Sequence, residues 1–206
     1  MITPHHIDIV LSWFDMLGIA VFAASGALQA ARQRQTLVTF AFFALITGTG
    51  GGTLRDLLIG APVFWVHDSR YPLICLAIPL LVWVTPRRWW QDRALDWFDA
   101  VGLAAYAVFG AAKSMAFGIA PVPAAVMGVV TACVGGILRD VLAGQPSIIL
   151  RPELYVTAAA LSAFLFVGLA LIGVPPLIAA FAAAAAGFVL RALAIVRGLS
   201  LPGYRN

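Results

Sequence analysis

The chain has 206 residues, of which 62% are hydrophobic and 11% are charged, and its mean hydropathy is +0.97. A soluble fold of this length needs far more polar surface, so the composition excludes a soluble domain. The formal net charge is +4. The arginines mostly stand at the ends of apolar segments, which is typical of membrane orientation and not of nucleic-acid binding.

Apolar runs close to the length that spans a bilayer, about 20 residues, recur along the chain. We expect one all-α membrane domain over residues 1–206 with seven transmembrane helices. Their expected ranges are about 7–30, 36–59, 71–85, 95–116, 121–143, 152–173 and 176–197. Pro72, Pro121, Pro152 and Pro176 stand where four of them begin, because a residue without an N–H group is tolerated in the first turn. The last helix is rich in alanine, which predicts a scaffold packed closely on its neighbours.

The chain is an internal duplication with an offset of 84 residues. Gly51-Gly52-Thr53-Leu54-Arg55-Asp56 returns as Gly135-Gly136-Ile137-Leu138-Arg139-Asp140, and Phe14-Asp15 returns as Phe98-Asp99. Each copy contains three helices, and an odd number sends the second copy into the membrane from the opposite side. We therefore expect an inverted three-plus-three repeat, with repeat one at about 7–86, repeat two at about 91–173, and the extra helix at about 176–197.

The basic residues predict the orientation of the chain. One set of segment ends carries Arg32, Arg34, Arg87, Arg88, Arg93, Arg151, Arg197 and Arg205. The opposite set carries Arg70, together with Lys113 if that residue lies near the end of the fourth helix. Positive charge collects on the cytoplasmic side, so we expect the N-terminus outside and the C-terminus in the cytoplasm.

Glycines interrupt the second and fifth helices at matched positions. Thr47, Gly50, Gly51 and Gly52 correspond to Thr131, Val134, Gly135 and Gly136. The glycines predict a kink or an unwound turn, whose freed carbonyl groups could replace part of the hydration shell of a cation. Plain close packing is the alternative. The threonine hydroxyls either add oxygen ligands or bond back to their own helix, and Val134 puts equal kinking in doubt.

Arg55-Asp56 and Arg139-Asp140 place charges inside apolar segments. Each such charge costs about 2.5–3.5 kcal/mol at the centre of a membrane helix, so the groups must be paired or hydrated. Adjacent helical residues point about 100° apart, so we do not expect them to face each other.

We expect two ion pairs within the repeats, Asp15–Arg55 and Asp99–Arg139, and we expect Asp56 and Asp140 to face water. The alternative is that all six charges only hold the bundle together.

The remaining candidates are weaker. Lys113 corresponds to Gln29 and either extends to the membrane interface or projects into the polar path. Cys75 and Cys133 are expected as buried small side chains. His5, His6 and His67 stand at the terminus or in a loop and predict no metal site. Because no nucleotide-binding or catalytic motif is visible, we expect neither an enzyme nor a cofactor.

On the two Gly-Gly-x-Leu-Arg-Asp motifs, the two Phe-Asp pairs and the extra last helix, the chain resembles the prokaryotic trimeric intracellular cation channels. Relatives of that family have also been catalogued as putative glycine transporters. The resemblance covers nearly all of the chain. It implies a homotrimer in a bacterial or archaeal cell membrane, in contact with lipids. It also implies a pore in each protomer that is lined by the kinked second and fifth helices and conducts monovalent cations, chiefly potassium.

Three hypotheses for function remain open at this point. The first is the passive cation channel, in which Arg139 and its partner aspartate would hold a closed constriction. The second is a carrier for glycine or another small amino acid, in which broken helices would supply N–H groups to a carboxylate. The third is a structural protein without transport.

Overall fold

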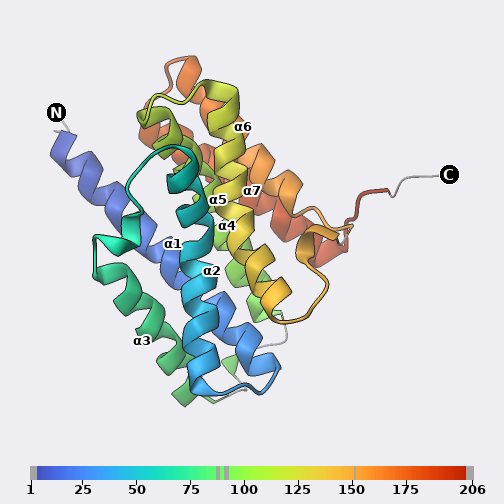
Figure 1. The fold of residues 1–206 in the computed structure, drawn as a ribbon. Coiled ribbons are helices and arrows are strands. Elements are labelled where there is room, and N and C mark those ends of the chain that lie inside the picture. The colour runs from blue at the N-terminus through green and yellow to red at the C-terminus, as the bar shows by residue number, and fades with distance from the viewer. Residues whose placement is uncertain (1–3, 87–88, 91–92, 151, 203–206) are drawn as a thin grey trace.

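The computed structural model describes residues 4–86, 89–90, 93–150 and 152–202, with side chains described from Asp15 onward. Within these residues the chain forms seven α-helices and short 3₁₀ turns (Figure 1). The elements are α1 (Pro4–Arg32), α2 (Leu37–Leu58), η1 (Phe64–Val66), α3 (Arg70–Val84), α4 (Ala94–Ala116), α5 (Pro121–Leu142), η3 (Ile148–Leu150), α6 (Val156–Leu171) and α7 (Pro176–Arg197). All seven predicted helices are confirmed.

The largest error in the predicted boundaries is at α6. Pro152 does not begin this helix; it lies in the preceding loop, where Leu201 donates a backbone hydrogen bond to its carbonyl oxygen. Glu153 pairs with Ser200 as an isolated bridge, so this part of the chain is held by the segment after α7. The helix begins only at Val156. By contrast, Pro121 and Pro176 are the first residues of α5 and α7, as expected.

A buried apolar cluster shows how the helices alternate in direction. It joins residues from the end of α1, the start of α2, the end of α3 and the start of α4, including Ala27, Phe40, Val82 and Leu95. Ala143, directly after α5, packs in the same cluster. Successive helices therefore run in opposite directions between the two ends of the bundle, which Figure 1 also shows.

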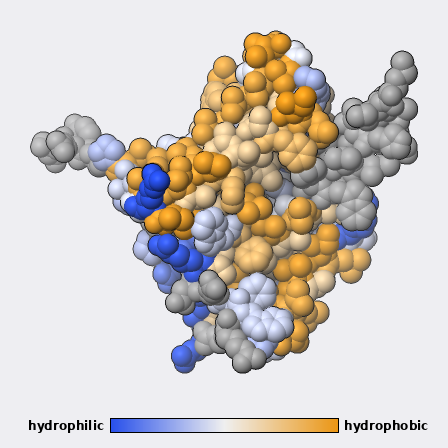
Figure 2. Space-filling model, turned by 180° about the vertical axis from the view of Figure 1, so that it is seen from behind, coloured by the Kyte–Doolittle hydropathy of each residue, from blue (hydrophilic) through white to orange (hydrophobic). Residues whose placement is uncertain are grey.

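The outside of the bundle is apolar. Large hydrophobic side chains such as Val38, Leu57, Leu73 and Ile178 are more than half exposed. Figure 2 shows one face, on which hydrophobic residues cover the upper part and the lower right, and hydrophilic residues gather along the left side toward the lower end. Among the described helices, α2, α4, α5 and α7 are long and apolar enough to cross a membrane, and α3 and α6 are shorter apolar helices. The protein is an all-helical membrane protein.

Contacts between the two copies are reciprocal. A Cβ atom on Gly18 of α1 would stand 2.0 Å from the ring of Tyr106, and one on Gly102 of α4 would stand 3.0 Å from the ring of Phe22. Gly18 and Phe22 correspond to Gly102 and Tyr106 under the 84-residue offset. Corresponding residues of the two copies therefore contact each other in both directions. In addition, α2 of the first copy contacts α5 of the second.

Candidate functional site

The matched glycines bring α2 and α5 into direct backbone contact. A Cβ atom on Gly51 would stand 2.1 Å from the carbonyl oxygen of Thr131, and one on Gly135 would stand 2.3 Å from that of Thr47. Both helices are continuous through these positions, so the expected unwound turn is absent from α2 and α5 as described. The glycines serve close packing, the alternative reading of the same motif.

The remaining glycines of the motif also meet neighbours. A Cβ atom on Gly50 would stand 2.8 Å from the end of the Leu138 side chain, one on Gly52 would stand 2.7 Å from the ring of Phe64, and one on Gly136 would stand 2.8 Å from the Tyr155 hydroxyl. The hydroxyl groups of Thr47 and Thr131 donate to the carbonyl oxygens of Phe43 and Met127, one turn earlier, at 2.6 Å each. They are therefore bonded to their own helices.

The two Arg-Asp pairs are buried, and each pair is joined directly. Nε of Arg55 donates to Oδ1 of Asp56 at 2.9 Å, and Nε of Arg139 donates to Oδ1 of Asp140 at 2.9 Å. The expectation that adjacent residues do not face each other was wrong, because the long arginine side chain lets Nε reach the carboxylate of the next residue. Both arginines are only 1% exposed.

Asp56 is fully buried, so the expectation that it faces water was wrong, whereas Asp140 is 4% exposed and lines a polar cavity. The second carboxylate oxygen of Asp56 accepts from the backbone N–H of Phe64 at 3.1 Å, and that of Asp140 accepts from the N–H of Ile148 at 2.9 Å. Phe64 and Ile148 correspond under the repeat offset. Each aspartate therefore holds the short turn that follows its own helix against the helix end.

The predicted ion pair between Asp99 and Arg139 is confirmed. Nη1 of Arg139 lies 2.7 Å from Oδ1 of Asp99. Ser25 of α1 joins the same group: it accepts from Nη1 of Arg139 and donates to Oδ1 of Asp99 at 3.0 Å. The pair is thus bridged by a hydroxyl group from the first copy.

The predicted pair between Asp15 and Arg55 is wrong. The Asp15 carboxylate accepts instead from the hydroxyl groups of Tyr71, at 2.7 Å, and Tyr106, at 2.8 Å. Arg55 packs its guanidinium carbon 5.2 Å from the ring centre of Phe109, and its Nη1 has no hydrogen-bond partner among the described residues.

Two differences between the copies explain why only one ion pair forms. Phe109 occupies the repeat position of Ser25, so the first copy lacks the hydroxyl that joins arginine to aspartate in the second. Tyr106 occupies the position of Phe22, so Asp15 gains a donor that Asp99 lacks. The sequence reasoning missed Ser25, Tyr106 and Phe109 as site residues. Comparing the two copies position by position around the charges would have found them.

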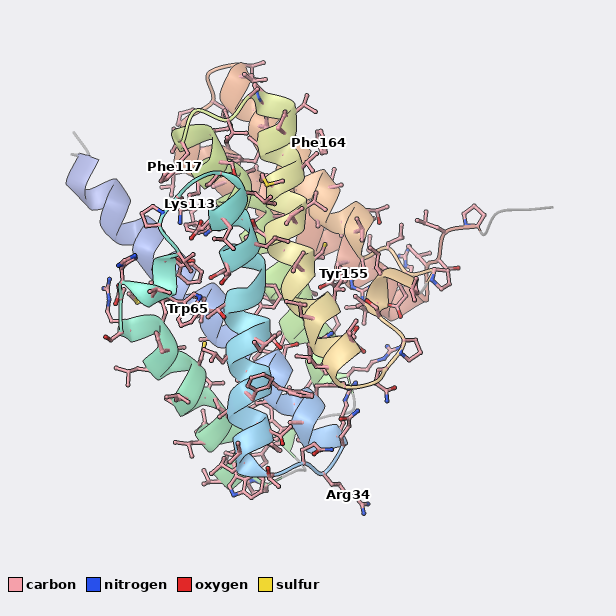
Figure 3. All side chains as sticks on the ribbon, in the orientation of Figure 1. Arg34, Trp65, Lys113, Phe117, Tyr155 and Phe164 are labelled. Carbon is pink, nitrogen blue, oxygen red and sulfur yellow. The ribbon has the colours of Figure 1, made fainter. Side chains whose placement is uncertain are left out.

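Lys113 projects into the bundle. Its Nζ lies 2.8 Å from Oδ1 of Asp56, and the side chain is 20% exposed. This ion pair joins α4 of the second copy to α2 of the first. Figure 3 shows Lys113 and Phe117 toward one end of the bundle and Arg34 at the other.

The repeat partner of Lys113 is Gln29, which lines a cavity of about 230 Å³ at the other charged cluster. Asp140, Arg139, Asp96, Arg32 and Gln145 also line it. Arg32 and Gln145 are exposed, so the cavity reaches the surface. The two copies thus differ here as well: one holds an ammonium group beside its aspartate, and the other has an open polar space.

Comparison with known proteins agrees with this arrangement. A family model described as "Glycine transporter" matches residues 12–87 and 96–171, one match for each copy. A UPF0126 membrane protein of Vibrio cholerae is 41% identical over 155 residues, which cover 72% of this chain and 64% of the relative. The alignment therefore spans slightly less than two thirds of that relative. The inner membrane protein YadS of Escherichia coli is 40% identical over 152 residues, covering 71% of this chain and 72% of the relative.

The fold is similar to that of a solved structure. The TRIC trimeric intracellular cation channel orthologue from Rhodobacter sphaeroides has a TM-score of 0.86 and 43% sequence identity, covering 92% of this chain and 99% of the other. With both copies matched by the family model and nearly the whole fold shared, the chain belongs to the family described as glycine transporter, which includes the prokaryotic trimeric intracellular cation channel homologues.

Proposed function

We propose that this protein is a membrane channel that passes monovalent cations, chiefly potassium, through a pore inside each protomer that is lined by α2 and α5. The observation that carries the proposal is the pairing of these two helices. They touch at Gly51 and Gly135, and each carries a buried Arg-Asp pair toward its C-terminal end. Support for cation passage comes from the solved relative at 43% identity, which is described as a cation channel.

The pathway proposed here runs between two charged clusters at opposite ends of the α2–α5 contact. Its residues are Thr47, Gly50, Gly51, Gly52, Arg55, Asp56, Thr131, Gly135, Gly136, Arg139 and Asp140, with Asp15, Asp99 and Lys113 beside them. Because an arginine alone repels cations, the aspartates must offset the arginine charge along the path. The ion pairs described above provide that balance. Arg139, held by Asp99, Asp140 and Ser25, is proposed as the closed inner constriction.

The two copies, at about 7–86 and 91–173, are proposed to be inverted in the membrane, with the helix at 176–197 outside the repeat. Reciprocal contacts support this: Gly18 meets Tyr106 while Gly102 meets Phe22. We further propose a homotrimer in a bacterial cell membrane, surrounded by lipid, with the N-terminus outside. The orientation rests on the arginines near the ends of helices, of which Arg87, Arg88, Arg151 and Arg205 lie outside the described residues.

A carrier for glycine is the alternative that the family description names. It is not favoured, because the solved relative at 43% identity is a cation channel. The broken helices that the carrier hypothesis expected are also not found in α2 and α5 as described, although this holds for the cation path as well. The solved relative is described as a channel, and none of the comparisons indicates an enzyme family.

Reconstitution of the purified protein in planar bilayers tests the proposal. We expect single-channel steps with currents of potassium larger than those of sodium under asymmetric salt. Saturable glycine uptake with counterflow, in the absence of such steps, would replace the channel with the carrier. Arg139→Ala and Asp99→Asn test the constriction: we expect both variants to raise open probability, and an unchanged open probability in both removes that role.

A further inference from the structure

The two charged clusters carry different buried charge. In the first copy, Asp15 and Asp56 are accompanied by Arg55 and Lys113, so two negative groups are matched by two positive ones. In the second copy, Asp99 and Asp140 are accompanied by Arg139 alone, because Gln29 stands at the position of Lys113.

The other charged groups near the second cluster do not remove this difference. Arg32 and Asp96 line the same cavity with opposite charges and interact electrostatically. Arg191 and Glu153 also act on Asp96, and they form an ion pair with each other at 2.7 Å. Since the charges of each pair offset each other, the second cluster keeps one negative charge in excess. An unbalanced charge inside a membrane protein is costly, so a positive charge from outside the chain is favoured there.

Lys113 indicates where that positive charge belongs. Its ammonium group lies 2.8 Å from Asp56, as a bound cation would. The corresponding position in the second copy lies beside Asp140, where Gln29 leaves the cavity of about 230 Å³. Gln29 is 7% exposed, and its amide forms no hydrogen bond with any described residue, so its carbonyl oxygen is available inside the cavity.

We propose that this cavity binds one monovalent cation between Asp140 and Gln29, at the position related to Lys113 Nζ by the repeat. The inference deepens the proposed channel function and rests on it for the identity of the ion. Carboxylate and carbonyl oxygens are the ligands that hard cations take in proteins, and carbonyl oxygens replace the hydration shell of potassium in channel filters. In the first copy the positive charge is the ammonium group of Lys113. In the second copy it is an ion bound from solution.

The experiment is an exchange of the two repeat partners. Crystals grown in rubidium or thallium salts are measured for anomalous scattering in the wild type, Gln29→Lys and Lys113→Gln. Gln35→Lys is the matched control, because it adds the same charge on an exposed loop residue outside the cavity lining. We expect a peak beside Asp140 in the wild type and in Gln35→Lys, its loss in Gln29→Lys, and a new peak beside Asp56 in Lys113→Gln.

The absence of an anomalous peak in the wild-type cavity overturns the proposal, as does a peak that persists in Gln29→Lys.

The wild-type protein also provides a second measurement that needs no variant. Its thermal midpoint in potassium chloride should exceed that in N-methylglucamine chloride of equal ionic strength, since a ligand that binds only the folded state raises stability. An equal midpoint in the two salts counts against the site, and so does a rise produced by glycine instead of potassium.

Bilayer currents of the same preparations separate this inference from the channel function. Normal wild-type cation currents with no peak in the cavity refute the bound ion and leave the channel standing. A peak that Gln29→Lys removes, in a protein without currents, supports the ion site and refutes the channel.

Discussion

Gly51 of α2 lies so close to Thr131 of α5 that a Cβ atom on the glycine would stand 2.1 Å from the threonine carbonyl oxygen. The reciprocal contact, between Gly135 and Thr47, is nearly as close, at 2.3 Å. Because backbone stands on the other side of each contact, no flexible side chain can move aside. These two contacts set the spacing of the helices at the centre of the bundle.

Gly51→Ala and Gly135→Ala should therefore separate α2 from α5 and destabilise the protein by about 1–3 kcal/mol each, the usual cost of overpacking. The measurement is the thermal midpoint in detergent, followed by the loss of the native elution peak. Gly168→Ala is the control: it lies inside α6 with nothing within 4 Å of its Cβ position, so alanine there should be neutral or slightly stabilising. Equal effects at all three positions would contradict the close-contact argument.

Arg139→Ala should destabilise the protein more than Asp99→Asn. The first change leaves the carboxylates of Asp99 and Asp140 buried without their arginine, and breaking a buried pair in this way costs about 3–5 kcal/mol. The second change leaves Arg139 bonded to Asp140 and Ser25. Chemical unfolding of both variants in the same detergent measures the difference, and the reverse order would show that Asp99 is the main partner.

The missing ion pair of the first copy can be built by giving it the residues of the second. Phe109→Ser adds the bridging hydroxyl beside Arg55, and Tyr106→Phe removes one donor from Asp15. The double variant should bring an Arg55 nitrogen within hydrogen-bond distance of Asp15, by analogy with the 2.7 Å contact of Arg139 and Asp99. A crystal structure of the variant is the measurement. If Arg55 still packs on residue 109 without contacting Asp15, these two positions do not control the pairing.

The exposed ion pair of Asp68 and Arg70 should contribute little to the free energy of unfolding. The direction in which that contribution changes with pH follows from the pKa of Asp68. Hydrogen bonds from Arg70 lower the pKa of the Asp68 carboxyl below its ordinary value. A lowered folded-state pKa means that the contribution is present above the ordinary carboxyl pKa and is lost as pH falls through the lowered value. Asp68→Asn should thus leave the thermal midpoint nearly unchanged at neutral pH and slightly reduce its fall in acid. High salt should weaken even this difference, because exposed charges are screened.

The number and order of the helices could be predicted from the sequence, because apolar length and the 84-residue repeat are local or periodic properties. The position of the charges along α2 and α5 could be predicted for the same reason. The partners of these charges could not. Asp99–Arg139 was predicted and Asp15–Arg55 was predicted on equal grounds, yet only the first forms.

The sequence by itself determined that the chain is a duplicated all-helical membrane protein with glycines and Arg-Asp pairs at matched positions. The tertiary structure alone decided that the glycines bring continuous helices together, and that Ser25, Phe109 and Tyr106 direct which charges pair. The physical reason is the distance along the chain over which each property acts. Apolar length and periodicity act along one segment, whereas the partner of a buried charge depends on donors supplied by another helix, many residues away in the chain.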